Sequence, residues 1–188
     1  MRKIVAGLFI SLDGVVGAPE EWAFTYLNDE VSTWITAGIA QADAVLLGRR
    51  TYQQFAKIWP SQGSKVPMAR FLNRSPKYVI AQKSESMGAF DWEPVTLLTG
   101  TLAEESMKLK AQPGENIQVP GSPRLVRSLL REGLLDELSL VICPVVIGKG
   151  MLLFDEVADR ITLKLVESKT FTHGVLSVTY QPASSARS

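Results

Sequence analysis

The sequence predicts an α/β domain built on a mainly parallel sheet with an antiparallel addition at one edge. Two observations support this fold class. From residue 3 to about residue 135, short apolar runs alternate with segments of helical spacing. After that point three strand patterns follow. No helical pattern separates the last two, which are joined by a Thr-His-Gly turn.

The first strand is expected at residues 3–10, KIVAGLFI, which are apolar and partly β-branched. Gly7 lies inside this run, and a glycine within a strand often marks a close approach by another group. A loop rich in Gly and Pro follows at 11–22. Apolar residues at helical spacing predict a helix at about 27–40, with Asn28 as its N-cap.

The middle of the chain continues the alternation. The expected elements are a buried strand at 43–48, a short helix at 49–59, a polar loop containing proline at 60–76, strands at 77–81 and 95–98, and an amphipathic helix at 102–111.

The clearest helical pattern covers 122–135, after a strand at 116–121. Ser122 is its expected N-cap, Pro123 occupies the first helical position, and Gly133 ends it. The last strands are expected at 136–148, 161–171 and 174–182. We expect a single domain over residues 1–181 and a disordered tail over 182–188.

Composition excludes several classes of protein. The chain has 188 residues, of which 46% are hydrophobic and 21% charged, with a formal net charge of +1. A near-neutral charge argues against nucleic acid and acidic membranes as partners. The chain has one cysteine, Cys143, and one histidine, His173, so we expect no disulfide and no metal site. No signal peptide or membrane-spanning run is visible, which predicts a soluble cytoplasmic protein.

Two strand-to-helix junctions are candidate anion sites. They read Gly48-Arg49-Arg50-Thr51 and Gly121-Ser122-Pro123-Arg124. A helix N-terminus offers free N–H groups and the positive end of a dipole, and arginine binds phosphate oxygens in a bidentate manner. The alternative is ordinary structure, since glycine before a capped helix and arginine on a first turn are both common.

Standard nucleotide fingerprints are absent from both junctions, which match neither G-x-G-x-x-G nor G-x-x-x-x-G-K-[ST]. Gly148-Lys149-Gly150 resembles a fragment of a phosphate loop. Cys143 stands where that motif needs glycine, and Met151 stands where it needs Ser or Thr. We therefore reject it as a phosphate loop.

Four segments carry a resemblance to a known family. They read LFISLDGVV, ADAVLLGRRTYQQF, VPGSPRLVRSLLREGLLDELSLVICPVVIGKGMLLF and LKLVESKTFTHGVLSVTY, in that order over nearly the whole chain. The chain resembles the dihydrofolate reductase–like superfamily, in the branch that contains the C-terminal reductase domain of riboflavin-biosynthesis deaminase-reductases. The resemblance implies a three-layer α/β fold, with helices on both faces of a mixed, mostly parallel sheet and a C-terminal antiparallel hairpin.

The resemblance also implies NADPH as cofactor. It places the turn of Arg49 to Thr51 under the dinucleotide phosphates and the Gly121-Ser122 turn against the pyrophosphate. The segment after the third strand would recognise the adenosine 2′-phosphate. The cofactor-binding residues expected on this basis are Gly14, Gly48, Arg49, Arg50, Thr51, Gln82, Lys83, Ser84, Gly121, Ser122 and Leu125. Relatives often have two glycines at the pyrophosphate turn, whereas this chain has Pro120 before Gly121, and proline donates no N–H.

The sequence does not identify a single proton donor. Hydride reduction of a C=N bond needs a proton for the nitrogen. Asp29 and Glu30 lie in the region where dihydrofolate reductases carry a carboxylate, and Asp13 is a third candidate catalytic residue. The alternatives are ordinary acids at a helix N-terminus for Asp29 and Glu30, and a turn role for Asp13.

The resemblance therefore predicts an NADPH-dependent reductase of a small heterocyclic, pterin- or aminopyrimidine-like, or carbonyl substrate. A non-catalytic nucleotide-binding protein of the same fold is the alternative. The deaminase half of the bifunctional enzyme is not expected, because its zinc ligands are missing. Subunits in the family pair through their edge strands, which implies a homodimer.

Overall fold

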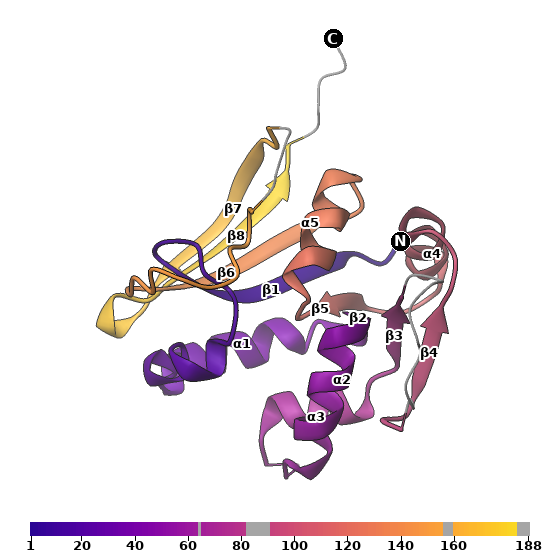
Figure 1. The fold of residues 1–188 in the computed structure, drawn as a ribbon, viewed down its shortest axis with the longest axis horizontal. Helices are drawn as coiled ribbons and strands as arrows, with labels where there is room; N and C mark the ends of the chain where they lie inside the picture. The colour runs from indigo at the N-terminus through magenta and orange to yellow at the C-terminus, as the bar shows by residue number, and fades with distance from the viewer. Residues whose placement is uncertain (64, 82–90, 156–159, 184–188) are drawn as a thin grey trace.

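The computed structural model describes residues 1–63, 65–81, 91–155 and 160–183. Eight strands form one sheet, and five α-helices pack against it (Figure 1). The strands are β1 (Ile4–Ser11), β2 (Ala42–Gly48), β3 (Lys77–Ile80), β4 (Val95–Leu98), β5 (Asn116–Val119), β6 (Glu137–Cys143), β7 (Leu163–Thr170) and β8 (Leu176–Pro182). The helices are α1 (Asp29–Ile39), α2 (Arg49–Ile58), α3 (Pro67–Arg74), α4 (Leu102–Ala111) and α5 (Pro123–Arg131).

The strand order is β4-β3-β2-β5-β1-β6-β8-β7. All neighbours from β4 to β6 pair in parallel, and β8 is antiparallel to both β6 and β7. The predicted mixed, mostly parallel sheet with a C-terminal hairpin is confirmed. One detail differs: the strand expected at 136–148 begins no antiparallel block, because β6 lies parallel to β1 from Val5↔Glu137 to Ser11↔Cys143.

Helices cover both faces of the sheet. The first core cluster joins Ile4, Ala6 and Leu46 to α4 and α5, through residues such as Leu109 and Leu129. On the opposite face a second cluster joins β2 and β3 to α2 and α3. A third cluster packs α1 against the β7–β8 hairpin. The three-layer arrangement implied by the resemblance is therefore present, with α1, α2 and α3 on one face and α4 and α5 on the other (Figure 1).

Two predicted helix caps are confirmed. Asn28 Oδ1 accepts a hydrogen bond from Val31 N at 2.9 Å, and Ser122 Oγ accepts one from Leu125 N at 3.4 Å. Each cap satisfies one N–H group that the first turn would otherwise leave unpaired. Among the described residues, no helix is long and apolar enough to cross a membrane.

The predicted boundaries of two segments, the polar loop and the C-terminal tail, differ from those in the structure. The predicted polar loop at 60–76 contains α3, with Pro67 at its first turn and Ala69 and Leu72 buried. Its apolar residues are few, but they share one face and pack into the second core cluster. At the other end, β8 reaches Pro182, and the Ala183 N–H donates to Thr162 O at 2.9 Å. The remaining tail, 184–188, lies outside the described residues.

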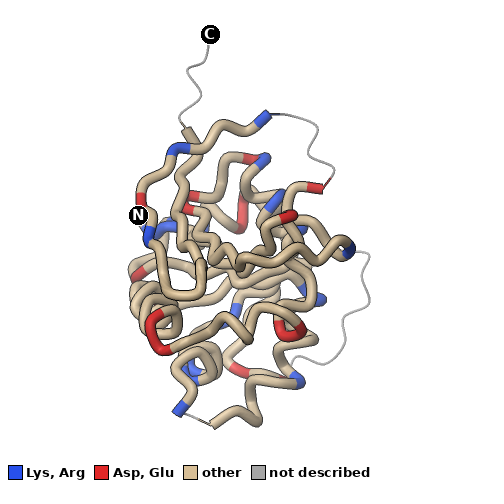
Figure 2. Tube along the Cα trace, turned by 90° about the vertical axis from the view of Figure 1, so that its left-hand side faces the viewer, with Lys and Arg blue, Asp and Glu red and all other residues tan. Residues whose placement is uncertain are grey.

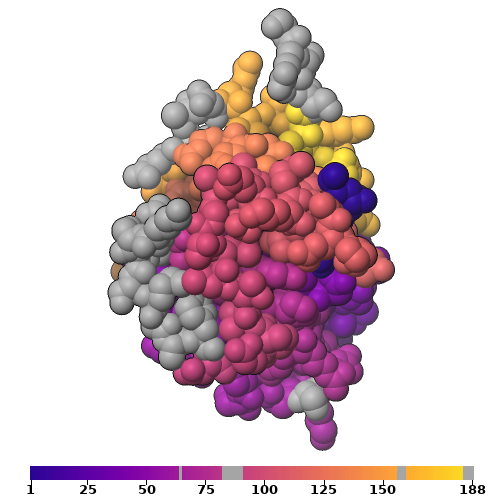
Figure 3. Space-filling model, turned by 90° about the vertical axis from the view of Figure 1, so that its right-hand side faces the viewer, coloured from indigo at the N-terminus to yellow at the C-terminus, as the bar shows by residue number. Residues whose placement is uncertain are grey.

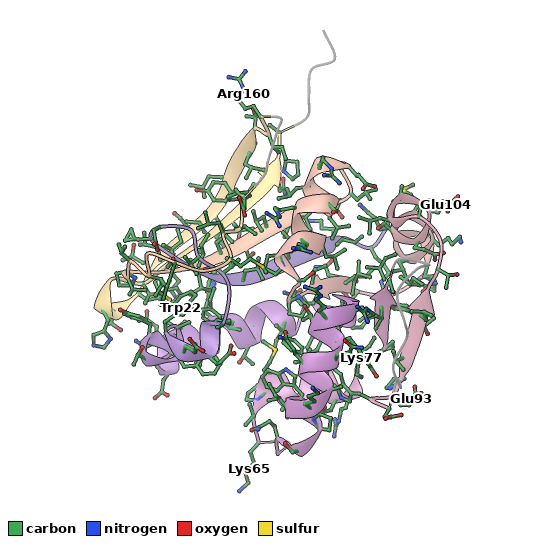
Figure 4. The ribbon with its side chains drawn as sticks, in the orientation of Figure 1. Trp22, Lys65, Lys77, Glu93, Glu104 and Arg160 are labelled. Atoms are coloured by element: carbon green, nitrogen blue, oxygen red, sulfur yellow. The ribbon has the colours of Figure 1, made fainter. Side chains whose placement is uncertain are left out.

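Lys77 is an unusual member of the core, because its side chain is completely buried at the start of β3. Its ammonium donates to Ser75 O at 2.8 Å and lies 4.6 Å from the ring centroid of Trp92. Trp92 is itself held by Asn73, which accepts from the indole N–H at 2.8 Å. Burial lowers the pKa of Lys77 to about 8. Figure 4 shows Lys77 beside β3, and Figure 3 shows residues of β4 and α4 covering this edge.

Lys77 should make stability depend on alkaline pH. Its folded pKa of about 8 lies below the ordinary 10.5, so between these values the unfolded chain binds more protons. The free energy of unfolding should therefore rise with pH across that window. Urea unfolding at several pH values, for wild type and Lys77→Met, measures the effect. The difference between the two proteins should shrink or reverse in favour of wild type as pH rises, and a constant difference would contradict the assignment.

Candidate functional site

The two strand-to-helix junctions predicted to bind an anion are in contact. Gly48 ends β2 and is the N-cap of α2, and Ser122 follows β5 and caps α5. A Cβ added to Gly48 would lie 2.8 Å from Ser122 Oγ, and one added to Gly121 would lie 3.5 Å from Thr51 Oγ1. Neighbouring parallel strands end at the same edge of a sheet, and this contact is the direct consequence of β2 and β5 being paired.

The chain leaves these two strands in opposite directions. After β2, α2 packs on one face of the sheet and the chain moves outward to β3. After β5, α5 packs on the other face and the chain moves to β6 beyond β1. The space between β2 and β5 is thus a topological switch point. In open α/β sheets, ligands bind in the crevice beyond the strand ends at such a point.

Both helices direct their positive ends to this crevice. Gly48 has no side chain to cap α2, so the N–H groups of its first turn are not satisfied by a cap. Arg49 and Arg50 open α2, and Arg124 lies in the first turn of α5. Arg50 and Arg124 are exposed, whereas the Thr51 side chain is buried against the second junction.

This positive character is local. Elsewhere basic and acidic residues are interspersed, as Figure 2 shows for one side of the molecule. On α5, Arg127 donates to the backbone carbonyl of Asp155, which ties that helix to the segment after β6. An anion is therefore expected at the crevice because two helices begin there with Arg49, Arg50 and Arg124 in their first turns, and not because of the net charge of +1.

The backbone at the second junction requires glycine. Gly121 has φ +146°, and the Gly121–Ser122 peptide bond is cis. Pro120, which offers no N–H, precedes it. The Leu125 N–H, a predicted contact of the cofactor, donates to Ser122 Oγ, and the Leu125 side chain is buried in the core. Among the described residues, no group of His, Cys, Asp or Glu gathers that could hold a metal ion.

Asp13 is held by three hydrogen bonds in the loop after β1. Its carboxylate accepts from Ser11 Oγ at 2.6 Å, from Gly148 N at 2.7 Å and from Ile147 N at 3.1 Å. These bonds, with that of Ser11 the largest contribution, lower the pKa of Asp13 to about 2. The group is therefore ionised at neutral pH. This environment suits the turn role better than proton donation.

Backbone hydrogen bonds join the same two loops along their length. Leu12 N donates to Val145 O at 2.8 Å, Val16 N donates to Met151 O at 2.9 Å, and Leu153 N donates to Gly14 O at 3.0 Å. Gly14, a predicted cofactor contact, has φ +88° and lies within this pairing. The loop after β6 was missed as part of the site. The only signal for it in the sequence was the glycine-rich stretch rejected as a phosphate loop.

The two other candidate acids lie at the β7–β8 hairpin. Glu30 Oε2 accepts from Thr172 N at 3.4 Å, and Asn28 Nδ2 donates to Thr172 Oγ1 at 2.7 Å. Asp29 and Glu30 also line an open hollow that Lys169 borders. Both carboxylates thus lie next to the β7–β8 hairpin. Gln82, Lys83 and Ser84, predicted to bind the 2′-phosphate, lie outside the described residues.

The chain belongs to the RibD C-terminal domain family, whose model matches residues 2–177. It is 30% identical to the uncharacterized protein YyaP of Bacillus subtilis (strain 168) over 183 residues, which cover 95% of this chain and 94% of that protein. The predicted membership of the riboflavin-reductase branch is thereby confirmed.

Solved structures show the same fold. A diaminohydroxyphosphoribosylaminopyrimidine deaminase/5-amino-6-(5-phosphoribosylamino)uracil reductase from Thermotoga maritima matches with a TM-score of 0.67 and 16% identity, over 97% of this chain and 57% of that one. A dihydrofolate reductase from Enterococcus faecalis, complexed with NADP(H), matches with a TM-score of 0.59 and 14% identity, over 96% of each chain. The predicted dihydrofolate reductase–like fold is confirmed.

The Gly48–Ser122 contact can be tested by a double-mutant cycle. Gly48 has φ −73°, so alanine is sterically permitted there except for the 2.8 Å approach to Ser122 Oγ. We expect Gly48→Ala to destabilise the protein by about 1–3 kcal/mol and Ser122→Ala to cost about 1 kcal/mol through its cap. The double variant should lose less than the sum, because Ser122 Cβ would lie at an ordinary 3.6 Å. Additive losses in urea unfolding would contradict the contact.

Asp13→Asn should loosen the pairing of the two loops. The Asp13 pKa of about 2 lies below the ordinary 3.8, so its contribution to stability is full above pH 3.8 and is lost as pH falls toward 2. Unfolding measured from pH 5 to pH 2 should show wild type and variant converging over that range. In parallel, the Ile147 and Gly148 amides should exchange hydrogen faster in the variant at neutral pH. Unchanged exchange at both amides would show that the carboxylate does not hold the loop.

Proposed function

We propose that this protein is an NADPH-dependent reductase of a small heterocyclic or carbonyl substrate. The observation that carries the proposal is the contact between the Gly48 and Gly121-Ser122 junctions at the switch point of the sheet. It supports binding of a dinucleotide because two helix N-termini and arginines of both helices serve one crevice. Membership of the RibD C-terminal domain family, and the fold shared with an NADP(H)-bound reductase, support the choice of cofactor.

The residues present fit such a cofactor. Because Gly48 and Gly121 have no side chains, the backbone at both turns can approach a phosphate closely. A side chain at Gly48 would collide with Ser122 even without a ligand. Arg50 and Arg124 supply exposed guanidinium groups for the phosphates, and the buried Thr51 fixes the distance between the two turns. NADPH, when bound, supplies the hydride; the protein supplies position and charge.

Proton delivery falls to groups other than Asp13, which is ionised and fully engaged. Asp29 and Glu30 are the remaining carboxylates from the sequence prediction, and they border a hollow open to solvent. In this proposal the proton comes from one of them or from water, and the substrate enters from their side of α1.

The proposed protein is a cytoplasmic homodimer. Strand β7 forms an outer edge of the sheet, and all of its residues after Leu163 are exposed, with Leu165 49% and Val166 43% accessible. An exposed, partly apolar edge strand of this length favours pairing with a second copy.

The first test of the proposed function is cofactor binding. Intrinsic tryptophan fluorescence of the purified protein should be quenched on titration with NADPH, and NADH should bind more weakly. Arg50→Ala should weaken NADPH binding by about tenfold, the value of one charge-assisted hydrogen bond. Arg131→Ala, which removes an exposed arginine at the far end of α5, serves as the matched control. Equal affinities for wild type and Arg50→Ala would remove the cofactor from this crevice.

A non-catalytic nucleotide-binding protein is the second candidate. It is favoured by Pro120, which supplies no N–H at the second junction, and by the ionised state of Asp13. A panel of pterins, aminopyrimidines and carbonyl compounds separates the two. Substrate-dependent oxidation of NADPH supports the reductase, whereas tight NADPH binding without turnover across the panel supports the second candidate.

A further inference from the structure

A groove of about 300 Å³ lies between α1 and the sheet. Val5, Asn116 and Glu137, which line it, stand within the first two residues of β1, β5 and β6. These strands are parallel, so the groove lies at the opposite end of the sheet from Gly48 and Gly121. At a rise of about 3.3 Å per residue, Val5 is about 20 Å from the far end of β1. Gln118, which also lines the groove, lies closer, three residues or about 10 Å before Gly121. The groove opens on the face that α1 covers, whereas the crevice lies beyond the ends of β2 and β5.

Strand register shows that this part of the sheet is polar on one face. Residues paired across neighbouring strands point to the same side. One cross-strand row reads Gln118, Val5, Glu137, and the next reads Gly7, Ser139, Thr179, Glu167. The row that alternates with them reads Val119, Ala6, Leu138, Tyr180 and is part of the core. Central strands between helical layers are normally apolar on both faces, so the polar rows need an explanation.

Three carboxamides face this groove without partners. Gln41, Asn116 and Gln118 line it, and in the described part of the chain none of their side chains makes a hydrogen bond. The Gln118 amide extends across Gly7, where an added Cβ would lie 2.7 Å from Gln118 Nε2. The glycine thus leaves space for the amide. Asn116 and Gln118 are half-buried, whereas Gln41 is exposed. Amides that find no partner within the protein are available to a ligand.

The charged residues of the groove and the Trp34 indole indicate which kind of ligand fits it. Of the described residues that line the groove, the charged ones are Glu137 and Glu167, and the Lys169 ammonium lies next to it over the Trp34 ring. Glu137 is paired with Lys3 at 2.8 Å, whereas Glu167 is exposed. A phosphate is therefore disfavoured, in contrast to the crevice at Gly48. Trp34 also lines the groove, and the Lys169 ammonium lies 5.0 Å from its ring centroid. A flat ring can stack on the part of the indole that Lys169 leaves uncovered.

We propose that this groove binds a planar, uncharged nitrogen heterocycle with an amide or amidine edge, a nucleobase being the simplest example. Carboxamides pair with such an edge through one donor and one acceptor, as Asn and Gln do with adenine in DNA. The Ser139 and Thr179 hydroxyls, 2.9 Å apart, provide further hydrogen bonds beside Gly7. The site rests on these side chains alone and does not depend on the proposed reductase function.

The test is a titration of the ¹⁵N-labelled protein with adenine, observed through side-chain amide resonances. The side-chain NH₂ signals of Gln118 and Asn116 should shift and saturate, whereas that of Gln112, after α4, should not. Gln118→Leu should weaken adenine binding by about tenfold, with the matched Gln112→Leu unchanged. 6-Dimethylaminopurine, which lacks the amino N–H donors, and AMP, which adds a phosphate, should both bind more weakly than adenine.

Four outcomes would overturn the proposal. They are the absence of saturable shifts in a protein whose spectrum shows it folded, equal binding by Gln118→Leu, equal binding of 6-dimethylaminopurine, and displacement of adenine by NADPH. The last outcome would assign adenine to the cofactor crevice. Because NADPH binding is measured separately with Arg50→Ala, failure of this site and failure of the reductase proposal are distinguishable.

Discussion

The pairing of β5 between β1 and β2 determines where the proposed cofactor site lies. Seventy or so residues of chain separate β2 from β5, yet the sheet places the ends of both strands side by side. From these ends α2 and α5 leave on opposite faces of the sheet. The two turns approach so closely that a Cβ added to Gly48 would lie 2.8 Å from Ser122 Oγ. Every other feature of the proposed cofactor site follows from this geometry.

The two ends of the sheet also differ in the charge and polarity of their side chains. At the carboxyl ends of the strands, helix dipoles and arginines create a positive crevice. At the amino ends, on the face that α1 covers, carboxamides, hydroxyls and two carboxylates line a groove, and Lys3 pairs with one of these carboxylates, Glu137. Under the two proposals, the positive end would attract a phosphorylated ligand, and the groove with its carboxylates would favour an uncharged base.

Local patterns in the sequence predicted most helices and strands. Features that depend on pairing between distant segments could not be predicted. Ser122 and Asn28 were identifiable as caps because a cap depends on residues three positions away. The strand order was not accessible from pattern, since a strand's neighbours depend on which distant residues it pairs with; the fold came from the family resemblance. Helix α3 was missed because its apolar face is short, although Pro67 stands at its start as Pro123 does in α5. The polar groove could not be predicted from the sequence. Gln118 and Ser139 become neighbours of Gly7 only through the pairing of β5 and β6 with β1.

The candidate acids show why residue type alone is a poor guide to a proton donor. Asp13, Asp29 and Glu30 are all carboxylates near the start of the chain, and the sequence could not rank them. The structure separates them by their partners. Asp13 accepts three hydrogen bonds as an anion, and each bond stabilises the ionised form, so the contacts that make it a good loop anchor make it a poor acid. Glu30 receives a single long bond, from Thr172, and Asp29 borders open solvent. A group that must release and regain a proton has to avoid such strong anchoring, and on that ground Asp29 and Glu30 remain the better candidates.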